Sequence, residues 1–181
     1  MSRVIVDVGE QSTSLHSGAE GYVIPCGSGS LRARHFTSDP PQPADLTNAI
    51  GETMDHLDDA KRAMPSLDVP RADDDDDEAD TFVLAGRLAQ VIAAVEHGGS
   101  IDADTFSLSR DAAEDVFRTV ATEARADRRH NPGLPAAAVD DIVGACCVVV
   151  ALFRGLHLDH VVIDLADEPA GHTASHAEVG T

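Results

Sequence analysis

The sequence has few aromatic residues and no long hydrophobic run. Only 3% of its residues are aromatic and none is Trp, so a core has to be built from Val, Leu, Ile and Ala. The most apolar run, from Ile142 to Phe153, is shorter than the roughly 20 residues that cross a bilayer. We therefore expect no membrane segment, and we interpret this run as a buried helix.

Basic residues are also scarce. The chain has 13 of them against 32 acidic residues, which gives a formal net charge of -19. Such a field repels the phosphate backbones of nucleic acids and anionic membrane surfaces. We expect no nucleic acid and no membrane among the partners of this protein. An acidic surface also keeps proteins soluble, and this is the simpler interpretation of the charge.

Cysteine is the third scarce residue type, since Cys26, Cys146 and Cys147 have no paired spacing. Adjacent cysteines on one helix point in different directions, so no disulfide framework is indicated. Cys146 and Cys147 lie in the most apolar run and are expected to be core residues. Near the start of the chain, Asp7 appears before any apolar stretch long enough for a secretory signal. We predict a cytoplasmic protein.

The sequence does contain an alternation of short β-branched runs and helical patterns, over a length typical of one domain. Strand patterns cover residues 4–8, 13–16, 22–25, 81–84 and 161–163. Helical patterns cover residues 30–36, 43–60, 88–97, 110–129 and 139–154. The first three strands are separated by short turns, which predicts an antiparallel meander. We predict one α/β domain over residues 1–167, with a mixed sheet and flanking helices.

Two segments lack the periodic apolar residues of a packed helix or strand. Residues 66–80 include the acidic run Asp73 to Asp77, and residues 168–181 are rich in Gly, Ala, His and Ser. We expect both to be disordered, because like charges repel and polar segments bury little. The acidic run lacks the glycine and the spaced oxygen ligands of an EF-hand. His172 and His176 lack a third ligand nearby, so no metal site is expected in the tail.

The first strands contain the pattern Val4-Ile-Val-Asp7-Val-Gly9-Glu-Gln-Ser12-Thr13-Ser-Leu15. It resembles the opening of the second domain of the exopolyphosphatase and guanosine-pentaphosphate phosphatase (Ppx/GppA) family, which reads Asp-Ile-Gly-Gly-Gly-Ser-Thr-Glu-Leu. The resemblance implies a single actin-like, ribonuclease-H-like domain. It continues in order through Ile24-Pro-Cys-Gly27, Leu31, Ser38-Asp-Pro-Pro41, Ala85-Gly86-Arg87, Leu108-Ser109, Asn131-Pro-Gly-Leu134 and a helix with Asp140, Ile142 and Val143.

The resemblance implies a phosphate site on two loops. Its residues would be Gly9, Ser12 and Thr13 in the first loop and Gly86 and Arg87 in the second. Asp7 stands where the family has a catalytic carboxylate that holds a metal or orients a water, with Mg2+ as the metal of an active protein. Two alternatives stay open: Asp7 is also a common turn residue, and Arg87 could be a solvated charge.

Several positions depart from the family pattern. Glu10 and Gln11 replace two glycines and put a negative charge where a phosphate is expected, and Ser14 replaces the second acid. In the second loop, Ala85 and Arg87 replace a glycine and a threonine. The first domain of the family, which supplies the proposed catalytic base, has no counterpart in this sequence. We therefore expect a degenerate, non-catalytic regulatory or binding module with weak phosphate or nucleotide affinity.

Two rival functions remain. One is a phosphohydrolase on polyphosphate or guanosine polyphosphate, completed by a separate first domain or by a dimer. The other is a metal nuclease using Asp7, which the negative charge disfavours because no basic stripe is present to hold a phosphate backbone. The resemblance also implies a homodimer or a protein partner across the cleft face, which faces another domain in the family.

Overall fold

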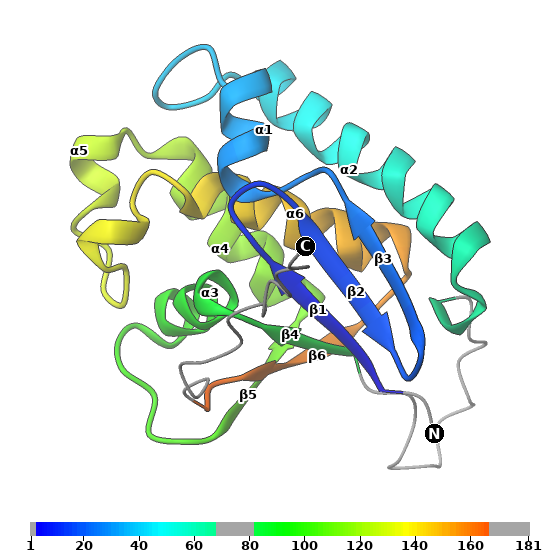
Figure 1. The fold of residues 1–181 in the computed structure, drawn as a ribbon. Coiled ribbons are helices and arrows are strands. Elements are labelled where there is room, and N and C mark those ends of the chain that lie inside the picture. Colours follow the sequence, from blue (N-terminus) through cyan, green and yellow to red (C-terminus); the bar gives the residue numbers. More distant parts are fainter. Residues whose placement is uncertain (1–2, 68–81, 167–181) are drawn as a thin grey trace, which may run out of the picture.

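The computed structural model describes residues 3–67 and 82–166. Six strands form one mixed sheet in the order β3-β2-β1-β4-β6-β5 (Figure 1). The strands are β1 (Val4–Val8), β2 (Thr13–Ser17), β3 (Glu20–Ile24), β4 (Phe82–Ala85), β5 (Thr105–Ser109) and β6 (His160–Asp164). β1, β2 and β3 pair antiparallel, whereas β4 is parallel to both β1 and β6. The predicted α/β class and the opening meander are confirmed.

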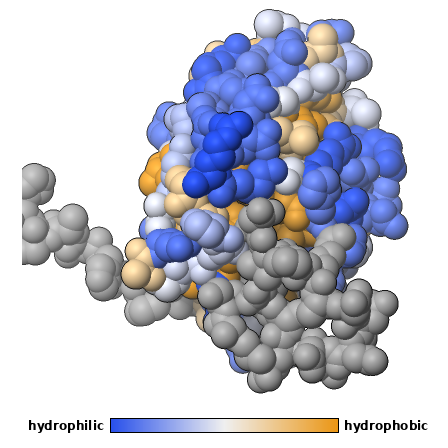
Figure 2. Space-filling model, turned by 90° about the vertical axis from the view of Figure 1, so that its right-hand side faces the viewer, coloured by the Kyte–Doolittle hydropathy of each residue, from blue (hydrophilic) through white to orange (hydrophobic). Residues whose placement is uncertain are grey.

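Helices pack against this sheet and against one another. They are α1 (Ser28–His35), α2 (Pro43–Ala63), α3 (Arg87–His97), α4 (Arg110–Thr122), α5 (Arg125–Arg128) and α6 (Ile142–Gly155). Short 3-10 turns cover Pro65–Leu67 and Ala136–Ala138. The outer face of α2 is polar, and on the side of the molecule where it lies hydrophilic patches alternate with hydrophobic surface (Figure 2).

α6 is the centre of the core. Every residue in it except Arg154 is buried, and it contacts α1, α2, α3 and α4. The prediction of a buried helix from Ile142 is therefore confirmed. Cys146 and Cys147 lie inside this core, and burial raises the pKa of the Cys147 thiol to about 12, so neither thiol is poised as a nucleophile. In the described part of the chain, every helix is too short or too polar to span a membrane.

The patterns misplaced several elements. The helix expected to end near residue 129 ends at Thr122, and a separate turn, α5, follows. The expected start at Val139 is also wrong, because a 3-10 turn precedes α6. β5 was not predicted at all.

The two expected disordered segments are only partly within the described chain. Ser66 and Leu67 belong to a 3-10 turn, so the expectation of disorder is wrong for them. Residues 68–80 and the tail 168–181 lie outside the described residues.

Candidate phosphate-binding site

The turn between β1 and β2 is closed by its own backbone. The Gly9 N–H donates to the Ser12 carbonyl over 3.0 Å, and a Cβ on Gly9 would come within 2.8 Å of that oxygen. The hydroxyl of Thr13 is buried and donates to the carbonyl of Cys26 over 2.7 Å. In this structure Thr13 therefore holds the turn to the end of β3, while Ser12 stays half-buried.

The same turn docks onto the N-terminus of α1. The carbonyl of Gly9 accepts from the Ser28 N–H over 3.0 Å, and the carbonyl of Glu10 accepts from the N–H groups of Gly29 and Ser30 over 2.8 and 3.0 Å. These three N–H groups are among those that a helix otherwise offers to an anion. A phosphate would have to displace the loop carbonyls to reach them. This contact was not predicted from the sequence. The small residues Gly and Ser at positions 27–30 could have indicated it, because they allow another backbone to approach closely.

Asp7 meets the second loop because β1 and β4 are parallel neighbours. The register pairs Asp7 with Ala85, so the carboxylate lies at the same sheet edge as Gly86. Gly86 has a φ of 87°, and a Cβ on it would collide with the Asp7 carboxylate. Of the residues predicted for the site, Asp7 and Gly86 are thus brought together. On the other side, the register pairs Asp7 with Ser14, the position where the family pattern has its second acid.

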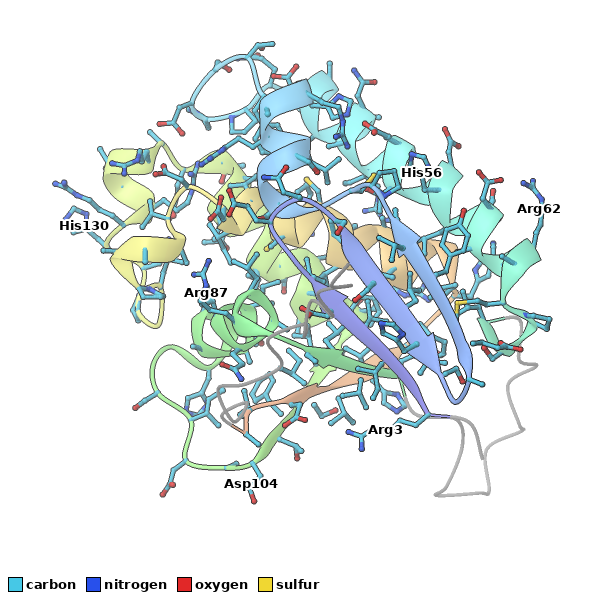
Figure 3. The ribbon with its side chains drawn as sticks, in the orientation of Figure 1. Arg3, His56, Arg62, Arg87, Asp104 and His130 are labelled. Carbon is cyan, nitrogen blue, oxygen red and sulfur yellow. The ribbon has the colours of Figure 1, made fainter. Side chains whose placement is uncertain are left out.

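Two arginines converge beside this edge. Arg87, the first residue of α3, projects toward the start of α6 (Figure 3), and its Nη2 lies 3.9 Å from Asp141 Oδ2. Arg32 of α1 places Nη1 3.6 Å from Asp141 Oδ1. Asp141 is the N-cap residue of α6, and its side chain is 15% exposed against 43% and 57% for the two arginines. Sequence reasoning identified Arg87 but not Arg32.

Asp140, which the family resemblance also singled out, lies in a different interaction. Both of its oxygens accept from Arg125, over 2.6 and 3.1 Å, and this hydrogen bonding holds the pKa of Asp140 below its usual range. A pocket of about 300 Å³ opens between this pair and Arg32. Its other polar walls include Asp39 and Arg128, which also pair with each other, so the pocket has little unpaired charge.

This arrangement suits a phosphate group better than a metal bound by protein alone. Arg32 and Arg87 offer forked donors that match phosphate oxygens, and α3 begins beside them with its positive dipole end. Within residues 3–67 and 82–166, Asp7 is not part of any group of three His, Cys, Asp or Glu side chains close enough to share an ion. Mg2+ would therefore need phosphate oxygens and waters as ligands in addition to the Asp7 carboxylate, which is the usual arrangement for Mg2+ in phosphate sites.

The comparisons with known proteins identify the fold. No protein-family model and no curated protein matches the sequence. A solved exopolyphosphatase-like protein matches 90% of this chain with a TM-score of 0.76 and 20% identity, over 55% of its own chain. The PPX-GPPA enzyme of Aquifex aeolicus matches 91% with a TM-score of 0.75 and 18% identity, over 53% of its chain.

An exopolyphosphatase from Cytophaga hutchinsonii gives a TM-score of 0.71 at 14% identity, over 90% of this chain and 53% of that one. The chain therefore spans about half the length of the solved structures that it matches. At identities this low, the likeness establishes the fold alone. The chain has the α/β fold of one domain of these Ppx/GppA structures, with the mixed six-stranded sheet and the opening meander.

Proposed function

We propose that this chain is a phosphate-binding module that does not hydrolyse phosphoanhydrides on its own. The observation that supports it is the convergence of Arg32 and Arg87 on one carboxylate, Asp141, beside Gly86 and the start of α3. The solved structures with this fold include a protein described as an exopolyphosphatase and another described as exopolyphosphatase-like. A polyphosphate or a nucleotide polyphosphate is therefore the expected class of ligand.

Binding should be weak for three structural reasons. An incoming anion competes with Asp141, which already neutralises part of the charge of both arginines. The N–H groups at the start of α1 are taken by the carbonyls of Gly9 and Glu10, so the first loop contributes few free backbone donors. The exposed Glu10 also adds a negative charge on this loop.

Turnover requires a positioned water, a base and several donors around the transferred phosphoryl group. Ser14, directly opposite Asp7, has a hydroxyl where the family pattern has a carboxylate. Asp7 itself is retained beside Gly86, and this favours a second candidate function. That candidate is a phosphohydrolase on polyphosphate or guanosine polyphosphate that a partner or a dimer completes.

Removing the Arg87 side chain should weaken binding of tripolyphosphate roughly tenfold. A hydrogen bond to a charged group contributes about 1.5–3 kcal/mol, and about 1.4 kcal/mol corresponds to a tenfold change in affinity. Calorimetric titration of the Arg87→Ala variant at low ionic strength measures this. Arg118→Ala is the matched control, because Arg118 is a similarly exposed arginine that pairs with Asp115 on α4. Equal weakening in both variants would show only a general charge effect and contradict the proposed site.

The unmodified chain should release no phosphate from polyphosphate above the background rate, with or without Mg2+. The reason is that Asp7 stands at the family's catalytic position, while its partner across the β1–β2 pair is Ser14, whose hydroxyl cannot act as the base that a carboxylate would be. A colorimetric phosphate assay on the chain and on Asp7→Ala checks this. Release by the unmodified chain that disappears in Asp7→Ala would overturn the binding-module proposal in favour of the phosphohydrolase.

A further inference from the structure

A second cluster of ligand-type side chains is made of residues that do not belong to the proposed phosphate site. One potential ligand atom from each of Cys26, Glu52 and His56 lies within 4.8 Å of the others. No other group of three His, Cys, Asp or Glu side chains is this close in the described residues. A thiol, a carboxylate and an imidazole are the ligand types that Zn2+ binds in proteins.

Two elements bring these side chains together. Glu52 and His56 are four residues apart on α2, so they share one face of the helix. Cys26 lies two residues beyond the end of β3, which packs against α2. His56 lies on the side of α2 toward β3 (Figure 3). Cys26 is fully buried, while Glu52 and His56 are half-buried, so the cluster sits at the edge of the core and is open on one side.

A cation already occupies part of this cluster. Arg34 Nη2 lies 2.8 Å from Glu52 Oε1 and 3.8 Å from Cys26 Sγ, and that sulfur is itself 3.9 Å from Glu52 Oε1. His35 Nε2 contacts the other oxygen of Glu52. The thiol and the carboxylate therefore face a common point where positive charge is favourable. Because the Arg34 side chain is 41% exposed, it can move into solvent without a large loss of packing.

We propose that Cys26, Glu52 and His56 bind a thiophilic divalent ion of the Zn2+ class, which replaces the Arg34 guanidinium. On binding, the Cys26 S–H bond breaks, its proton goes to solvent, and a sulfur–metal bond forms without any change of oxidation state. Three protein ligands leave the fourth tetrahedral position to water. His35 stays on the second oxygen of Glu52 and orients the carboxylate.

The geometry requires a modest contraction. Tetrahedral Zn2+ with bonds of about 2.0–2.3 Å holds its ligand atoms roughly 3.5 Å apart. The sulfur and the carboxylate oxygen, at 3.9 Å, are close to that separation. The widest pair in the cluster, within 4.8 Å, has to close by roughly 1 Å. Rotation of the half-buried Glu52 and His56 side chains can supply this movement without a shift of α2.

The ordinary alternative is an ion-pair network of Arg34, His35 and Glu52 that happens to cover a thiol. Titration with Co2+ in a non-thiol reductant separates the two, because only a thiolate ligand gives the intense sulfur-to-cobalt absorption in the near ultraviolet. We expect this band in the unmodified chain, and we expect stoichiometric Zn2+ to remove it. The acidic run and the tail histidines can bind Co2+ through oxygen or nitrogen, but they do not produce this band.

The variants test each ligand and the competing cation. Cys26→Ser and His56→Ala should lose the band or weaken Co2+ binding at least tenfold, while His16→Ala, an exposed histidine on β2, should keep it. Arg34→Gln should bind Co2+ several-fold more tightly, because the competing guanidinium is gone. Circular dichroism of each variant confirms folding, and Arg34→Gln tests the site even if Cys26→Ser is unstable. A band that survives Cys26→Ser, or no band in the unmodified chain and in Arg34→Gln, would overturn the proposal.

Discussion

Replacing Gly144 with alanine should lower the free energy of unfolding by about 2–3 kcal/mol, the upper part of the range for overpacking a core. Gly144 lies in α6 directly under the first residue of α1. A Cβ there would lie 2.8 Å from the Ser28 carbonyl carbon and closer still to its oxygen. These are backbone atoms, and the Ser28 N–H is tied to the carbonyl of Gly9 over 3.0 Å. The clash therefore cannot be relieved by a rotamer change.

Gly51→Ala is the matched control, since it makes the same change inside a helix. No atom lies within 4 Å of the position that a Cβ on Gly51 would take. Alanine there should stabilise the protein by about 0.5–1 kcal/mol, because glycine in a helix has the larger entropy loss on folding. Urea unfolding of both variants measures the difference. If Gly144→Ala were no less stable than Gly51→Ala, α1 could not pack on α6 as described.

The same contact links the core to the proposed phosphate site. α1 supports the turn after β1 through the bonds to Gly9 and Glu10, and it also carries Arg32. Pushing α1 away from α6 should therefore disturb the separation between Arg32 and Asp141. Because the proposed site depends on the contact between α1 and α6, a larger side chain at Gly144 should affect both stability and binding.

Local patterns in the sequence predicted those elements whose burial is periodic. β1 alternates buried Val4, Val6 and Val8 with exposed residues, and α6 is apolar all round, so both were recognised. β5 was missed because Leu108 is its single fully buried residue. Ser109 was recognised as a helix cap, and it does accept from the Ala112 N–H over 3.2 Å. The sequence around Ser109 has no pattern that would also identify it as the last residue of an edge strand.

The part of the candidate site that could be predicted from the sequence is the part whose positions are set by neighbouring strands. Asp7 lies near the end of β1 and Gly86 directly follows β4, and because these strands pair in parallel the two residues lie at the same end of the sheet. Arg32 and Asp141 are separated by more than a hundred residues, and nothing local marks either of them as a partner of Arg87. The proposed metal site is partly indicated by the sequence, because Glu52 and His56 are four residues apart in a helical segment, whereas nothing local pairs them with Cys26.

The basic segment after α4 shows why contacts between distant segments could not be predicted from hydrophobic periodicity. Its arginines suit the negative end of a helix, and that was the interpretation from sequence. Arg128 instead turns inward and is 4% exposed. Its guanidinium donates to the carbonyls of Val120 and Glu123 over 2.7 Å each and to that of Val139 over 3.3 Å. One side chain thus holds the end of α4 to the approach of α6, and no helical pattern encodes that.

Arg128→Met should therefore cost about 3–5 kcal/mol of unfolding free energy, because an unsatisfied buried acceptor costs about 1–3 kcal/mol and three carbonyls lose a donor. Methionine fills much of the volume, but the three carbonyls lose their donors in a place that water does not readily reach. Asp39, the acidic partner at 3.2 Å, is 48% exposed and can be rehydrated, so the carbonyls account for most of the cost. Arg125→Met on the same short helix is the control, because its pair with Asp140 is exposed on both sides and should contribute less than about 1 kcal/mol. Urea unfolding that shows the two variants equally stable would mean that Arg128 is a surface charge, and that α4, α5 and α6 are joined in some other way.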